Sequence, residues 1–240
     1  MDTATAAAAA AAAANAANTA NQYGIGHLWD TGGYIARAIL IILGLMSIGS
    51  WFIILTKLWD QRTLKKSARA VEKSFWSAPS LKDGVNKLKK SDDFRFIAET
   101  GMRAASHHEG RLTDRVDLHE WITMALQRAV DAVNQRSSSG LSFLATVGSS
   151  APFVGLFGTV IGILNALLAI SYAGQASLDK VAGPVGEALI MTALGLFAAV
   201  PAVWGYNWLL RRNRTIQEEV RNFASDLHAY LVSGSRVGNG

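Results

Sequence analysis

Long apolar runs with almost no charge constrain this sequence more than any other feature. Residues 38–56 carry no charge, and neither do residues 137–178. A third run, residues 184–210, contains one charged residue, Glu187. A helix needs about 20 apolar residues to cross the hydrocarbon of a bilayer at a rise of about 1.5 Å per residue. The sequence therefore predicts an all-α membrane protein with three transmembrane helices.

The remaining composition narrows the class of protein. Charged residues make up 17% of the chain, compared with roughly 25% in ordinary globular domains. The chain has no cysteine, which excludes disulfides and zinc–thiolate sites. The net charge is +5, but the basic residues flank the apolar runs, as topology signals do. No basic patch interleaved with aromatic residues is present, so we do not expect nucleic-acid binding.

The positions of Lys and Arg predict how the spans are oriented, because cytoplasmic loops are enriched in both. Residues 1–36 contain neither, and the link between the second and third spans carries only Lys180. Basic residues follow the first and third spans and precede the second: Lys57, Arg62, Lys65, Lys66, Arg69, Lys73, Arg128, Arg136, Arg211, Arg212, Arg214 and Arg221. We therefore expect the N-terminus outside and the C-terminus in the cytoplasm.

These signals divide the chain into seven predicted segments. They are an Ala-rich flexible outer extension (1–33), a first span (34–56), a cytoplasmic helical domain (57–137), a second span (138–172), an outer loop (173–183), a third span (184–210) and a cytoplasmic tail (211–240). A cleaved signal peptide is the alternative for the Ala-rich start, although it lacks the usual basic residues.

Two of the spans are expected to continue into the cytoplasm as helices. The first continues over residues 58–76. The uncharged run around the second is too long for one crossing, so its helix should extend back toward Asp114. Further helices are expected at residues 81–90, 94–105 and 114–135, with breaks at Pro79, at residues 91–92 and at residues 107–110.

Small residues gather on one face of the second and third spans when each residue advances the helix by 100°. That face holds Gly148, Ala151, Gly155, Gly158, Thr159, Gly162, Ala166 and Ala169 in the second span, and Glu187, Gly195, Ala198, Ala199, Ala202 and Gly205 in the third, with Thr192 at its border. Small residues let helix backbones approach closely in lipid. The two faces are expected either to pack together or to line a polar lumen, and both alternatives are compatible with several copies around a central partner.

Glu187 has two interpretations. Gly183 and Pro184 resemble a helix start, since proline is common at the first helical position. Glu187 would then lie in the first turn, where the helix dipole favours a negative charge. Its position on the small-residue face instead favours ion handling, because ionisable residues inside membranes are rare and usually functional.

Two stretches resemble the ExbB/TolQ/MotA proton-channel family, in particular its ExbB/TolQ branch. They are residues 144–163, LATVGSSAPFVGLFGTVIGI, and residues 186–207, GEALIMTALGLFAAVPAVWGYN. The resemblance implies a pentamer in the bacterial inner membrane, with the N-terminus in the periplasm, around single spans of ExbD. It also implies that the proton gradient drives TonB, which opens outer-membrane receptors for iron-siderophore, haem or cobalamin import. Thr159, Glu187 and Thr192 match the polar lumen residues of the family, which predicts a proton pathway through them.

Enzyme and metal motifs do not point to another activity. His119 and Glu120 begin like a zinc-protease helix, but Thr123 stands where the second histidine would be. His107 and His108 lie in a predicted turn without further ligands. We expect no catalytic residue, metal or cofactor. The rival hypotheses are a TolQ-like subunit that powers outer-membrane maintenance, and a passive membrane scaffold in which Glu187 only caps a helix.

Overall fold

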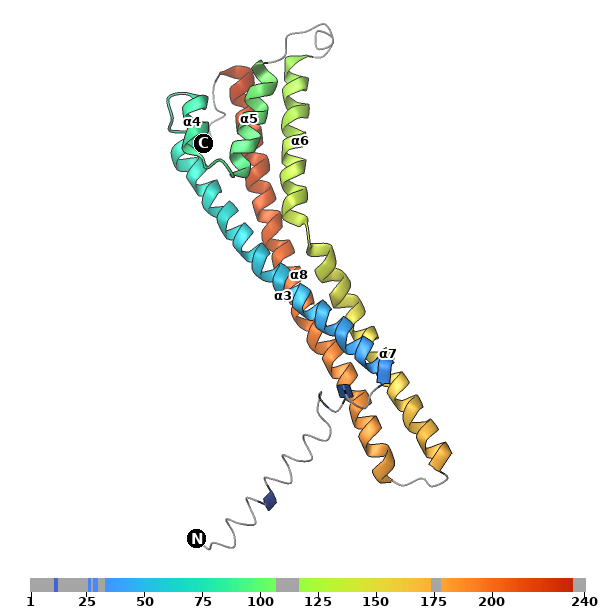
Figure 1. Cartoon of the computed structure of the whole chain (residues 1–240). Coiled ribbons are helices and arrows are strands. Elements are labelled where there is room, and N and C mark those ends of the chain that lie inside the picture. Colours follow the sequence, from blue (N-terminus) through green and yellow to red (C-terminus); the bar gives the residue numbers. More distant parts are fainter. Residues whose placement is uncertain are drawn as a thin grey trace, which may run out of the picture. The chain divides into compact units, whose positions relative to one another are not determined.

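The structure is a computed structural model that describes residues 11–12, 26, 28–29, 33–106, 117–173 and 178–234, with no side-chain placement at 173 and 178–182. Its elements in chain order are α3 (Gly33–Ala70), the π-helix η1 (Val71–Phe75), α4 (Leu81–Lys87), α5 (Asp93–Ser106), α6 (Leu118–Ser138), α7 (Leu141–Ala173) and α8 (Leu178–Ser233) (Figure 1). No strand occurs among the described residues. The all-α prediction is confirmed.

Among the described residues, three helical stretches are long and apolar enough to cross a membrane: Gly33–Phe75, Leu118–Tyr172 and Gly183–Ser233. They contain the three predicted spans, so the prediction of a three-span membrane protein is confirmed. Their limits relative to a bilayer, and the orientation of the termini, stay predictions. The Ala-rich start falls almost wholly outside the described residues.

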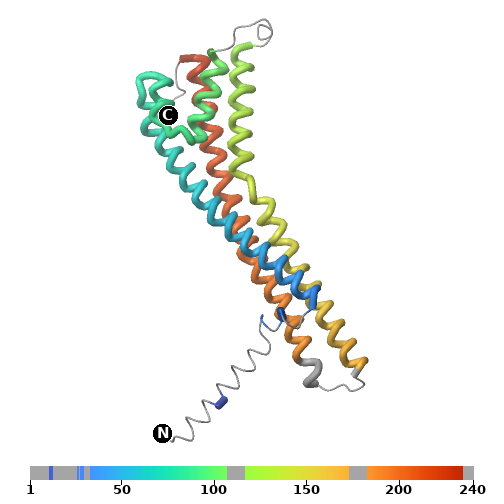
Figure 2. Tube along the Cα trace, viewed as in Figure 1, coloured from blue at the N-terminus to red at the C-terminus, as the bar shows by residue number. Residues whose placement is uncertain are grey.

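The chain divides into two compact units. The membrane unit comprises Met1–Phe52 and Phe143–Gly205, and the loop unit comprises Ile53–Ser142 and Tyr206–Gly240. Within the membrane unit, α7 and the first part of α8 run alongside each other (Figure 2). The bulky apolar side chains of this unit are left on its surface, as expected of helices that meet lipid or other membrane helices.

The loop unit has an ordinary hydrophobic core built from α5, α6 and the second part of α8. Its largest buried side chains include Phe94, Ile97, Ile122, Leu126 and Leu227. An aromatic cluster joins the end of η1 to this core, with the ring centroids of Phe75 and Phe94 each 5.3 Å from that of Phe223.

Short capping contacts begin α4 and α5. The Asp83 amide donates to Ser80 Oγ over 3.2 Å, and the Phe94 amide donates to Asp92 Oδ1 over 3.1 Å. Such contacts satisfy amides that have no partner within the helix. The predicted helix over residues 81–90 is shorter than expected and ends at Lys87. The predicted breaks at Pro79 and at residues 91–92 are confirmed, while that at residues 107–110 lies outside the described residues.

One predicted continuous helix is interrupted. The second span was expected to extend back toward Asp114, but the chain turns at Ser139 and Gly140 between α6 and α7. Gly140 has a φ of +82°, a conformation that glycine adopts without a steric cost. A Cβ atom there would also approach Ile53 Cγ2 to 3.2 Å. The glycine therefore ends one helix and allows the next to start at once.

The predicted helix start at Pro184 is wrong. Helix α8 begins at Leu178, and Pro184 lies inside it. A proline inside a helix removes one backbone hydrogen bond and hinders its neighbours. Helices in membrane proteins tolerate this because nearby groups and local adjustments satisfy the freed carbonyls. Glu187 is consequently beyond the first turn of α8, and a simple capping role does not explain its position.

Candidate functional site

The backbones of α7 and α8 come into direct contact in the membrane unit. A Cβ atom built on Gly155 would lie 2.7 Å from the carbonyl oxygen of Met191 and 3.1 Å from the Cα of Gly195. A Cβ atom built on Gly195 would lie 2.7 Å from the carbonyl oxygen of Ala151. Real Cβ atoms do not approach backbone this closely, so both positions require glycine for this packing.

The other small residues extend this contact along both helices. A Cβ atom on Gly158 would meet the Met191 side chain at 2.9 Å, and one on Gly162 would meet Ala188 Cβ at 2.8 Å. Ala198 and Ala202 are buried. The opposite faces carry the exposed residues Phe153, Leu156, Phe157, Val160, Leu164, Leu167, Leu189, Leu196, Phe197, Val200, Trp204 and Trp208. Within one chain, the small faces thus pack against each other, and a lumen lined by them stays a prediction.

Thr159 and Thr192 join the two helices through their hydroxyl groups. The side chain of Thr159 is buried, and that of Thr192 is half-buried. Thr159 Oγ1 contacts Thr192 Oγ1 in a short hydrogen bond and lies 3.1 Å from the carbonyl oxygen of Gly155. The two threonines of the predicted pathway are therefore adjacent. Each hydroxyl can both donate and accept a hydrogen bond.

Glu187 lines a cavity of about 250 Å³ in the membrane unit. The helices α3, α7 and α8 all contribute to its wall, which consists of Leu28, Ile35, Ala36, Ile39, Gly158, Ile161, Gly162, Asn165, Gly183, Pro184, Glu187, Ala188 and Met191. Glu187 is half-buried. Its carboxyl group therefore lies beside a space between helices, where water or a partner side chain has room.

Asn165 is a residue of this site that the sequence analysis missed. Among the residues that line the cavity, it and Glu187 are the two with hydrogen-bonding side-chain groups. The sequence does contain a signal for this residue, because Asn165 carries a polar side-chain amide within the long uncharged run of the second span. An amide in such a run needs hydrogen-bonding partners, which points to other helices or to water.

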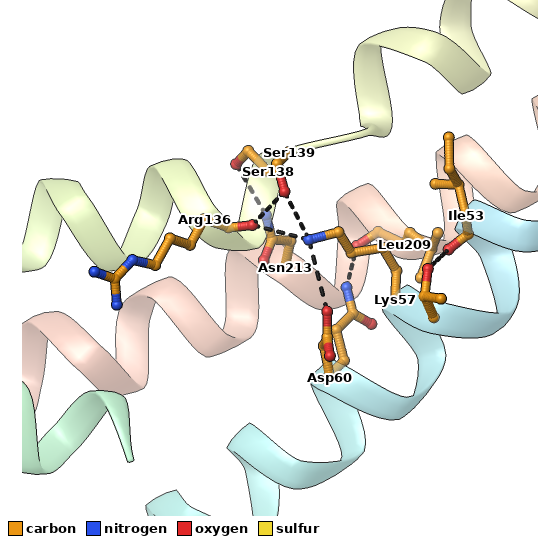
Figure 3. Close-up of polar contacts among 10 residues, drawn as sticks. Ile53, Lys57, Asp60, Arg136, Ser138, Ser139, Leu209 and Asn213 are labelled. Carbon is orange, nitrogen blue, oxygen red and sulfur yellow. Dashed lines mark hydrogen bonds and ion pairs between the residues drawn. The ribbon is translucent and has the colours of Figure 1, made fainter. Parts of the chain in front are cut away.

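A second polar cluster lies in the loop unit (Figure 3). Lys57 Nζ donates to the carbonyl oxygen of Arg136 over 2.8 Å and to Ser139 Oγ over 2.9 Å. It also lies 3.8 Å from Asp60 Oδ2. Gln61 Nε2 donates to the carbonyl oxygen of Leu209 over 3.1 Å. Lys57 thereby satisfies a carbonyl group at the end of α6, where cations are favoured.

Asp93 lies at the edge of this cluster, on a cavity of about 220 Å³. Burial raises the pKa of its carboxyl group above the ordinary value of 3.8. The Arg136 guanidinium, 3.7 Å away, opposes the rise in this pKa, while the carboxylates of Asp92 and Asp60 add to it. No local sequence pattern indicates this cluster, because its members come from distant segments of the chain.

The two described histidines of the loop unit, His119 and His228, do not form a metal site with other residues that the structure describes. The rings of His119 and His228 meet edge to face with centroids 4.5 Å apart, and Thr123 Oγ1 lies 3.1 Å from His228 Nε2. Within the described ranges, no group of three or more His, Cys, Asp or Glu residues is arranged to hold a metal ion. His107 and His108 lie outside these ranges.

Comparison with known proteins identifies relatives across most of the chain. Residues 89–222 match the MotA/TolQ/ExbB proton channel family. The biopolymer transport protein ExbB of Xanthomonas campestris is 41% identical over 212 residues, covering 85% of this chain and 84% of the relative. ExbB of Neisseria meningitidis is 32% identical over 211 residues, covering 86% and 96%. The Tol-Pal system protein TolQ of Pseudomonas aeruginosa is 34% identical over 209 residues, covering 85% and 90%. The chain therefore belongs to the MotA/TolQ/ExbB proton channel family.

Proposed function

We propose that this chain is the ExbB-type subunit of a proton-driven motor in the bacterial inner membrane. In this proposal several copies, five by the family resemblance, surround spans of ExbD, and proton passage through the complex drives TonB and thereby outer-membrane nutrient import. Membership of the family and the relatives named ExbB support the proposal. The transported nutrient stays open among iron-siderophore, haem and cobalamin.

The observation that carries the proposal is the location of Glu187. It is the one acidic residue in the third span, and it lines a cavity between helices. An ionised carboxylate at the bilayer centre costs about 2.5 to 3.5 kcal/mol on insertion scales. A carboxyl group that lies within a span and beyond the first turn of its helix is best explained by ion handling. Thr159 and Thr192 would continue the pathway, because their hydroxyl groups can pass hydrogen bonds to water or to a partner's acid.

The energy required is available from the membrane potential. One elementary charge that crosses 100 mV supplies about 2.3 kcal/mol. A few protons per step would therefore supply useful mechanical work without a nucleotide.

The test replaces Glu187 by Ala and by Gln in a bacterial host that lacks its own ExbB. Both variants should abolish TonB-dependent siderophore uptake and still copurify with ExbD. Leu189→Ala is the matched control, because Leu189 is on the same helix and 60% exposed, and it should support normal uptake. Full uptake by Glu187→Gln would refute the proposal and support the passive scaffold.

A TolQ-like role is the second candidate, and the match to TolQ of Pseudomonas aeruginosa favours it. The two roles predict different rescue. An ExbB-type subunit restores growth of an ExbB-deficient host under iron limitation. A TolQ-type subunit restores detergent resistance to a TolQ-deficient host. Rescue of detergent resistance alone would move the assignment to TolQ.

A further inference from the structure

The cavity beside Glu187 is open because the residues around it are small. Gly158, Gly162 and Gly183 contribute no side chain to the wall, and Ala36 and Ala188 contribute only methyl groups. The volume of about 250 Å³ is large compared with the roughly 30 Å³ that one water molecule occupies in the liquid. Several water molecules therefore fit beside the carboxyl group.

Size alone does not make a cavity wet, since apolar cavities of similar volume stay empty. A buried water molecule needs two to four polar partners. In this cavity the Glu187 carboxyl group supplies some of them, and the Asn165 amide supplies two donors and an acceptor. The two side chains come from different helices, α8 and α7, so water between them would be held from two sides.

The position of Asn165 along α7 also fits a route toward Glu187. Gly162 packs against Ala188, the neighbour of Glu187. Asn165 follows Gly162 by three residues, on the same side of the helix and about 4.5 Å farther along its axis. It lies toward the end of α7 that precedes residues 174–177, which is the outer end in the predicted orientation. Protons that enter from outside would reach Asn165 before Glu187.

The alternative for Asn165 is contact with lipid, and it is costly. An amide transferred from water to an apolar medium without a hydrogen bond costs roughly 2–7 kcal/mol. Asparagine in a membrane span accordingly faces other helices or water-filled space. Asn165 is exposed on the surface of the single chain, and the cavity that it lines together with Glu187 is the space of this kind beside it.

We propose that Asn165 is a positioning residue of the proton pathway, which holds water between the outer side of the membrane and the Glu187 carboxyl group. This inference rests on the proposed proton-conducting function and adds an entry step to it. Asn165 itself does not exchange a proton. It donates and accepts hydrogen bonds that keep a chain of water molecules in place, along which protons move to Glu187.

The first experiment measures the water directly. The chain has no cysteine, so single-cysteine variants can be labelled without background. Asn165→Cys, in the complex with ExbD in sealed inner-membrane preparations, should react with a small membrane-impermeant thiol reagent added from the outer side. The control is Leu164→Cys, which is at nearly the same depth and is exposed like Asn165 but does not line the cavity. We expect labelling of the first to be at least tenfold faster. Equal rates would overturn the hydrated cavity.

The second experiment measures conduction by the complex with ExbD in liposomes under an imposed pH gradient. Asn165→Leu should lower the proton flux tenfold or more, and Asn165→Ser, which keeps a polar group and room for water, should retain most of it. A purely structural role would instead lower copurification with ExbD, which both variants should leave unchanged. Normal flux in Asn165→Leu, or loss of assembly along with flux, would overturn the positioning role.

Glu187→Gln is measured alongside to separate the two proposals. If it blocks the flux while Asn165→Leu conducts normally, the inference about Asn165 fails and the proposed function stands. If Glu187→Gln conducts normally, the proposed function fails. In that case the labelling rates still decide whether the cavity holds water.

Discussion

Gly155 and Gly195 bring two membrane helices into backbone contact, since a Cβ atom on Gly195 would lie 3.0 Å from the Cα of Gly155. Neither residue is needed for an unusual backbone angle, because both are inside regular helices. Their function is to leave space for the backbone of the opposing helix. This closeness brings the Thr159 and Thr192 hydroxyl groups within hydrogen-bonding distance, one turn farther along α7.

Adding a methyl group at this contact should therefore destabilise the membrane unit. Gly195→Ala would place its Cβ 2.7 Å from the Ala151 carbonyl oxygen, and backbone cannot move aside as a flexible side chain can. Overpacking of this kind costs about 1–3 kcal/mol. The free energy of unfolding in detergent, followed by circular dichroism, should fall by about that amount.

Gly44→Ala is the control for this substitution. Gly44 is also inside a helix, but a Cβ atom there meets nothing within 4 Å. Alanine is a better helix former than glycine by about 1 kcal/mol, so this variant should be neutral or slightly more stable. Equal destabilisation of both variants would show that the contact between α7 and α8 is not the cause.

The threonine pair should show energetic coupling. Thr159→Val keeps the shape and leaves the Thr192 hydroxyl without its partner, which we expect to cost about 1 kcal/mol. Replacing both residues by valine should cost less than the sum of the two single changes, since no unpaired hydroxyl remains.

Unfolding free energies of the wild type, both single variants and the double variant give the coupling directly. Thr159→Ser serves as the control because it keeps the hydroxyl group. Strictly additive costs would mean that the hydrogen bond between the two side chains contributes nothing to stability.

Asp93 should make the stability of the loop unit depend on pH. Its pKa in the folded protein is raised above the ordinary value of 3.8, first by burial. The folded state therefore holds this proton more tightly than the unfolded state does. Stability must fall as the pH rises from the unfolded-state value through the raised folded-state value, and the penalty is fully present above both.

Asp93→Asn removes this titration. The melting temperature of the variant should exceed that of the wild type near neutral pH, and the difference should shrink as the pH is lowered toward 4. Asp93→Asn also removes the attraction to Arg136, which opposes the gain in melting temperature. Burial is nevertheless the larger cause of the pKa shift of Asp93. A difference that stays constant with pH would contradict the assignment of the penalty to Asp93.

Some features of the membrane unit can be predicted from the periodicity of the sequence, whereas others depend on tertiary packing. The small and bulky faces of α7 and α8 follow from the helical period alone. The start of α8 was mispredicted because proline is compatible with a helix start and with a helix interior, and the residues before Pro184 decide between them. The cavity at Glu187 requires α3, whose Ile35 and Ile39 form part of the wall.

The turn at Gly140 illustrates the same limit. A glycine within an uncharged run is weak evidence for a break, since membrane helices contain many. Lys57 also contacts the turn: from a segment far away in the sequence it donates to the carbonyl oxygen of Arg136 and to the hydroxyl group of Ser139. No pattern around residue 140 indicates that partner.

Lys57 should accordingly hold the end of α6 in place. The side chain is 12% exposed, and a hydrogen bond to a charged group contributes about 1.5–3 kcal/mol. Lys57→Met keeps the length of the side chain and removes the donor. We expect the turn at residues 139–140 to open more often, so limited proteolysis there should be about tenfold faster, in line with a loss of about 1.4 kcal/mol. Lys65→Met, at an exposed position of the same helix, is the control and should be cleaved at the wild-type rate. Unchanged cleavage of Lys57→Met would mean that Gly140 alone determines the turn.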